Sequence, residues 1–67
     1  MPQNEAEDKI IKFGDVLTSA DSEVHILGYD VEADAFLCDV FTLDGKLIGH
    51  ALPIRATIIE TCFRKRG

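Results

Sequence analysis

The stretch at residues 36–54 reads FLCDVFTLDGKLIGHALPI, which is two apolar runs on either side of Leu43-Asp44-Gly45-Lys46. An Asp-Gly pair between apolar runs is a strong signal for a β-hairpin, because tight hairpin turns need a residue with positive φ. The chain on either side must supply strands that pair with this hairpin, or its edges stay open. The sequence therefore predicts a small, mostly β domain.

The hairpin admits two registers, which place different side chains opposite each other. A two-residue turn at Asp44-Gly45 puts Asp39 opposite His50, whereas a three-residue loop at residues 43–45 puts Cys38 opposite His50. We favour the second register, because it gathers the apolar side chains on one face. That face carries Phe36, Cys38, Val40, Ile48, Leu52 and Ile54, interrupted only by His50.

Three further apolar runs predict strands beside this hairpin. They span residues 9–18, 23–30 and 57–63. Gly14-Asp15 predicts a bend within the first of them. The four-residue link at residues 31–34 is short enough to join its neighbours as an antiparallel hairpin. Pro53 lacks an N–H, so it belongs on an edge strand or at the end of its strand.

Five short strands, three tight links and a short turn before the last strand resemble the layout of SH3-like barrels, which Tudor and Sm-like domains share. The resemblance concerns strand order over residues 9–63 alone. The aromatic cluster of an SH3 peptide groove is absent, since the chain has no Trp and only one Tyr, Tyr29. We therefore predict a mainly β, small five-stranded antiparallel SH3-like barrel, with an OB-like or other small open barrel or sheet as the alternative.

A chain of 67 residues forms one domain, which we place at residues 9–63. Residues 1–8 are polar and acidic and predict a disordered tail, and residues 64–67 predict a basic tail. The sequence shows no secretory pattern and no apolar run of the ~18 residues that a membrane span needs. We therefore expect a cytoplasmic location, where Cys38 and Cys62 stay reduced.

The net charge of −5 is unevenly distributed along the chain. Residues 21–44 contain seven acidic residues and no lysine or arginine, whereas residues 46–67 contain five basic residues and one acidic residue. Arg64, Lys65 and Arg66 could contact phosphate or an acidic partner, which makes nucleic-acid binding one alternative function. Mimicry of nucleic acid by the acidic segment is the other alternative.

Two histidines and two cysteines fall one on each of four consecutive predicted strands. They are His25, Cys38, His50 and Cys62, and together they have the composition of a tetrahedral zinc site. No pair has the local spacing that such sites use, so we interpret them as separate residues and expect no metal or cofactor. The chain also lacks a glycine-rich phosphate loop and a G-x-S-x-G motif, and we expect no enzyme activity.

A non-catalytic protein-interaction module is therefore the favoured function. Apolar side chains occupy both faces of the hairpin, and one small domain cannot bury both. Leu37, Phe41 and Leu47 share the face away from the predicted core in the preferred register. We expect an interface at these three residues, through which the protein forms a homo-oligomer or binds a larger protein assembly.

Overall fold

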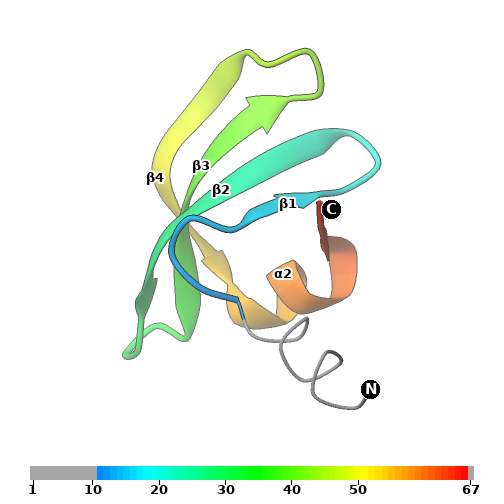
Figure 1. Ribbon diagram of the computed structural model, residues 1–67. Helices are drawn as coiled ribbons and strands as arrows, with labels where there is room; N and C mark the ends of the chain where they lie inside the picture. Colours follow the sequence, from blue (N-terminus) through cyan, green and yellow to red (C-terminus); the bar gives the residue numbers. More distant parts are fainter. Residues whose placement is uncertain (1–10, 67) are drawn as a thin grey trace.

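The computed structural model describes residues 11–66, which form one antiparallel sheet and one short helix (Figure 1). In chain order the elements are β1 (Val16–Thr18), β2 (Ser22–Asp30), β3 (Ala35–Thr42), β4 (Leu47–Arg55), α2 (Ala56–Cys62) and β5 (Arg64–Lys65). The strand order across the sheet is β4-β3-β2-β1-β5, so the first and last strands lie side by side.

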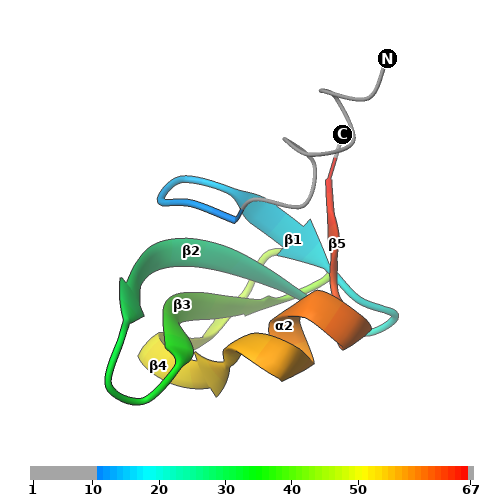
Figure 2. The same cartoon turned by 90° about the horizontal axis from the view of Figure 1, so that it is seen from below.

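The prediction of a mostly β, five-stranded antiparallel fold is confirmed, but the sheet of residues 11–66 does not close into a barrel. β4 and β5 lie at its two edges. Figure 2 shows β2 and β3 as curved strands, with β1 on one side of them and α2 and β4 on the other. Pro53 lies in β4, which pairs with β3 alone, so the edge position, the first of the two alternatives for this proline, is the one observed.

A single cluster of buried apolar side chains lies between the sheet and α2. It consists of Leu17, Val24, Ile26, Phe36, Cys38, Ala56 and Ile59. In β2, Val24 and Ile26 are buried and alternate with the half-buried His25, as expected for a strand with one face on the core. α2 completes the cluster with Ile59, which is 0% exposed. Burying a side chain of this size contributes about 1.5–3 kcal/mol.

The helix α2 corrects the prediction of a strand at residues 57–63. The β-branched composition of this segment favours a strand. Ala56, Ile59 and Phe63 also have the i, i+3, i+7 spacing of a helix face, and all three pack in or against the core. Local signals do not mark the helix, because Arg55 at the N-cap makes no side-chain hydrogen bond and the first turn contains no acid. Burial of one face therefore determines the structure here.

The fifth strand, β5, begins at Arg64, seven residues after the start of the strand predicted at residues 57–63. It pairs antiparallel with β1. Arg66 N extends this ladder by donating a hydrogen bond to Val16 O at 2.9 Å. The structure therefore includes Arg64 and Lys65 in the sheet, whereas the sequence predicted an exposed tail at residues 64–67. The tail predicted at residues 1–8 lies outside the described residues.

The bend predicted at Gly14-Asp15 is confirmed and shortens the first strand. Gly14 has a φ of 92°, and β1 begins after it. Backbone hydrogen bonds still join this bend to β2, because Gly14 N donates to Ile26 O and Ile26 N donates to Asp15 O, each at 2.9 Å. The bend therefore continues the contact between the first and second strands.

The β3–β4 hairpin turns through the three-residue loop that the preferred register predicted. Thr42 N donates to Lys46 O at 2.8 Å, and Gly45 N donates to Thr42 O at 2.9 Å. Gly45 has a φ of 96°, which confirms the predicted positive value. Phe41 faces Leu47 in the first pair after the loop.

The register changes twice farther from the loop. Val40 faces Gly49, and Cys38 faces Leu52. The predicted pairing of Cys38 with His50 is therefore wrong, because β4 contains bulges that a regular hairpin lacks. Neither of the two regular registers describes the whole hairpin.

The turn conformation can be tested with glycine substitutions. Gly45→Ala should lower the free energy of unfolding by ~1–2 kcal/mol, because a Cβ is unfavourable at this positive φ. No atom lies within 4 Å of the added Cβ, so the effect would be conformational rather than steric. Urea unfolding followed by circular dichroism measures the change.

Gly28→Ala is the matched control, because Gly28 also has open space around it but no positive φ. It should change the free energy of unfolding by less than about 0.5 kcal/mol. Equal effects of the two substitutions would contradict the assigned conformation of Gly45.

Candidate functional site

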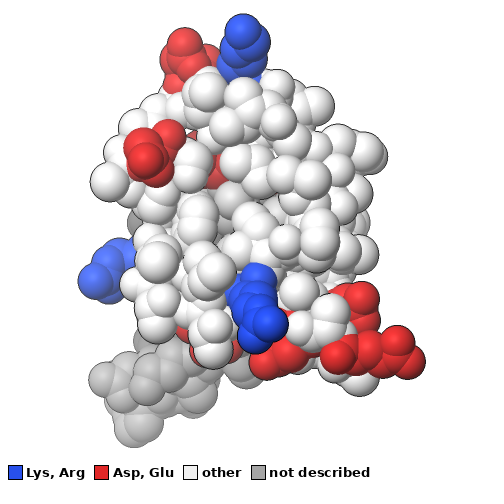
Figure 3. Space-filling model, turned by 180° about the vertical axis from the view of Figure 1, so that it is seen from behind, with Lys and Arg blue, Asp and Glu red and all other residues white. Residues whose placement is uncertain are grey.

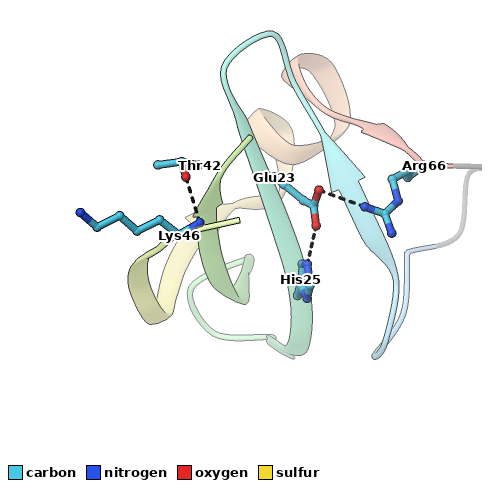
Figure 4. A network of polar contacts seen from close by, with 5 residues as sticks. All are labelled: Glu23, His25, Thr42, Lys46 and Arg66. Atoms are coloured by element: carbon cyan, nitrogen blue, oxygen red, sulfur yellow. Dashed lines mark hydrogen bonds and ion pairs between the residues drawn. The ribbon is translucent and has the colours of Figure 1, made fainter. Parts of the chain in front are cut away.

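A polar network lies on the sheet face opposite the core. Glu23 and His25 flank the buried Val24 in β2, so their side chains point away from the core. The Glu23 carboxylate contacts both His25 (Nε2 to Oε2, 2.7 Å) and Arg66 (Nη1 to Oε1, 3.0 Å). Figure 4 shows Glu23 between these two side chains, reaching across β1. The network therefore joins β2 to the residue that follows β5.

These contacts stabilise the ionised carboxylates on this side of the molecule. The hydrogen bond with His25, together with the charge of Arg66, lowers the pKa of Glu23. Nearby, Lys65 Nζ lies 3.4 Å from Asp15 Oδ2. Burial raises the pKa of Asp15, but the hydrogen bond from the Lys12 backbone and the contact with Lys65 outweigh this effect and lower it.

The three basic residues predicted to contact phosphate or an acidic partner are therefore not equivalent. Lys65 and Arg66 are paired with Asp15 and Glu23. Arg64 is exposed to solvent. The structure brings the three together on one short segment, but two of the three charges are offset by carboxylates of the same chain.

The Asp39 side chain stabilises a bulge in β4. Both His50 and Ala51 lie opposite Asp39, whose Oδ1 accepts a hydrogen bond from Ala51 N at 2.9 Å and lies 2.7 Å from His50 Nδ1. Ala51 has a φ of 52°, in the left-handed region. The hydrogen bond from Ala51, followed by the one with His50, lowers the pKa of Asp39. The bulge therefore creates the Asp39–His50 contact that the two-residue turn predicted.

The two histidines and two cysteines considered as zinc ligands lie apart. Cys38 is buried, and burial raises the pKa of its thiol to about 11. Cys62 is exposed on α2, His50 contacts Asp39, and the His25 ring packs against Phe41 with centroids 4.4 Å apart. In the described part of the chain, no group of three potential ligands could hold a metal ion.

The predicted interface residues lie on the face opposite the core, but they expose unequal amounts of surface. Leu47 is 50% exposed and faces Phe41 across the hairpin. Leu37 and Phe41 are half-buried, and the His25 ring covers part of Phe41. The structure therefore brings Phe41 and Leu47 together, while Leu47 alone among the three contributes a largely exposed side chain.

A second apolar area lies along β4 and α2. It contains Ile48, Leu52 and Ile58, which are 60%, 44% and 45% exposed, and we call it the β4–α2 surface. Figure 3 shows the molecule from behind, which is the side of the sheet where β4 and α2 lie in Figure 2. This side has a broad uncharged area with charged side chains mainly around its rim. Residues 47–54 contain no Asp, Glu, Lys or Arg, and Glu60 is the one such residue in α2.

The β4–α2 surface was not predicted from the sequence. Ile48 and Leu52 were predicted to lie on the buried hairpin face, and Ile58 was predicted to lie in a strand. Leu52 instead folds over Gly49, where an added Cβ would clash with Leu52 Cδ1. The helical spacing of Ala56, Ile59 and Phe63 was the signal that would have placed Ile58 outside the core.

Comparisons of the chain with models of known protein families, with curated protein sequences and with solved structures found no match. Within residues 11–66, no helix has both the length and the apolar character required to cross a bilayer.

The carboxylate contacts predict an acid-dependent loss of stability. The folded chain holds the pKa values of Glu23 and Asp39 below their ordinary values of 4.5 and 3.8. The unfolded chain therefore binds more protons in this range, and the free energy of unfolding should decrease as the pH falls below about 4.5. Glu23→Gln and Asp39→Asn should each reduce this decrease.

Urea unfolding at about pH 6, pH 4.5 and pH 3 measures the effect. These pH values span the ordinary range of carboxyl pKa values. Glu32→Gln is the control, because Glu32 is exposed and its carboxylate makes no ion pair within the described residues. The same pH dependence in all three variants and in the unsubstituted protein would contradict the stabilising role of these contacts.

Proposed function

We propose that this protein is a non-catalytic interaction module that binds a protein partner through the β4–α2 surface. The observation that carries the proposal is the exposure of Ile48, Leu52 and Ile58 on a largely uncharged area, which Arg55 and Glu60 border. Apolar patches of this kind, rimmed by charged side chains, mark interaction sites in proteins. Burial of these side chains by a partner would be favourable, because it removes apolar surface from water.

The side chains, rather than the backbone of β4, would provide this contact. An open edge strand can bind an added strand through backbone hydrogen bonds. In β4, however, Pro53 has no N–H, and Ala51 N already donates to Asp39. The left-handed conformation of Ala51 also interrupts the extended backbone. These features disfavour continuous strand addition along β4.

We also propose that the fold is an open relative of the SH3-like layout. The first and last strands are neighbours, and a short helix directly precedes the last strand. This layout supports the proposed relationship but does not specify a binding partner, because the function of small β folds depends on their surfaces.

A protein partner is favoured over nucleic acid by the distribution of charge. Lys65 and Arg66 contact carboxylates of the chain, which reduces the positive charge that this end presents. Among the acidic residues, Glu23 and Asp39 contact His25 and His50. In contrast, the apolar side chains of the β4–α2 surface are exposed to solvent.

An affinity capture from the organism that encodes the chain tests this proposal. The tagged protein should retain at least one specific protein, which Leu52→Asp and Ile58→Asp should each release, because a charge at the contact must be desolvated. Mass spectrometry with isotope labelling quantifies the retained proteins. If the chain binds itself, the untagged chain is among them.

Phe13→Asp is the matched control. Phe13 is 74% exposed, and it precedes β1, which is separated from β4 by two strands. This variant should retain the same proteins as the unsubstituted chain. Circular dichroism confirms that each variant is folded. Identical retention by all folded variants would overturn the assignment of binding to the β4–α2 surface.

A further inference from the structure

We propose that the partner of the β4–α2 surface is a second copy of this chain, bound antiparallel about a two-fold axis. The inference deepens the proposed function and rests on it. A two-fold interface joins the same patch of both copies, so the patch must complement itself in both polarity and charge. The arrangement of apolar and charged residues along β4 and α2 and at the two ends of the β3–β4 hairpin satisfies this requirement.

The apolar centre of the patch is compatible with itself in any orientation. Ile48 and Leu52 come from β4 and Ile58 comes from α2, and each of the three exposes at least 44% of its surface. Two copies facing each other would bury six large aliphatic side chains together. This contact provides attraction but does not select an orientation, because the hydrophobic effect is non-directional.

One end of the hairpin is acidic. Asp30, Glu32 and Asp34 lie at and after the end of β2, and the nearby Glu60 is on α2. The Tyr29 hydroxyl donates a hydrogen bond to Asp34 Oδ1, and this bond, burial and the charges of Asp34, Glu60 and Asp30 raise the pKa of Tyr29. None of the carboxylates makes an ion pair within residues 11–66.

The opposite end of the hairpin carries Lys46, beside the loop at residues 43–45. Its backbone N binds Thr42, while its ammonium group makes no ion pair in the described chain. Figure 1 shows this loop and the turn at residues 31–34 at opposite ends of the sheet. Lys46 is therefore an exposed cation at the end away from the acidic turn.

An antiparallel approach of two copies places opposite charges together at both ends. Lys46 of each copy would face the acidic turn of the other, and Arg55, which pairs with Ala35 beside that turn, would face Asp44. A parallel approach would instead bring two acidic turns together, and like charges in contact are repulsive. The charges therefore select the antiparallel orientation.

Sedimentation equilibrium at tens of micromolar protein and low salt tests the proposal. The expected mass is twice the 7.4 kDa of one chain. Leu52→Asp and Ile58→Asp should each give a folded monomer. Raising the salt concentration should weaken the dimer, because salt screens charge pairs at the rim.

A charge exchange tests the orientation. Lys46→Glu should raise the Kd by about tenfold, because the substitution occurs twice in a symmetric pair and converts attraction to repulsion. Combining it with Glu32→Lys should restore most of the affinity. Lys12→Glu is the control, because Lys12 precedes β1 and lies away from β4, and it should leave the Kd within about twofold.

The outcomes separate this inference from the proposed function. A monomer at all concentrations would overturn the inference, and the proposed function would still stand if affinity capture found another protein that Leu52→Asp releases. A dimer that the charge exchange does not restore would overturn the antiparallel orientation. A dimer unaffected by Leu52→Asp and Ile58→Asp would show that another surface forms it, and would overturn the inference.

Discussion

The Asp39 carboxylate determines how the second half of β4 meets the sheet. By accepting a hydrogen bond from Ala51 N and contacting His50, it stabilises a point at which two residues of β4 oppose one residue of β3. Every later residue of β4 is paired according to this shift. The start of α2 follows directly, so the placement of the helix on the core, and of the apolar surface beside it, depends on this carboxylate.

The sequence predicted the parts of the fold in which one pattern dominates. In β2, Val24 and Ile26 alternate with His25, and the Asp-Gly pair at residues 44–45 marks the turn, so both elements were correctly placed. The segment at residues 56–62 satisfies strand and helix patterns equally and carries no capping residue. Its conformation is determined by contacts with distant strands, which a local pattern cannot reveal.

The candidate surface was only partly predictable for a related reason. Apolar side chains on both sides of the hairpin correctly indicated more apolar surface than one core can bury. The pairing of β3 with β4 shifts at the bulges, so the exposure of each β4 side chain does not follow from either regular register. Leu47 is 50% exposed on the face where the interface was predicted, whereas Ile48 and Leu52 were predicted to be buried and are 60% and 44% exposed.

The pairing of β1 with β5 has a consequence for the order in which the structure forms and opens. β2, β3 and β4 pair with their neighbours in the chain, whereas Leu17 pairs with Lys65 across nearly the whole described length. Closing so long a loop costs more entropy than forming a hairpin. Because its ladder has only two residues, we expect β5 to join last and detach first, so amide hydrogens there should exchange with solvent before those of β2 and β3.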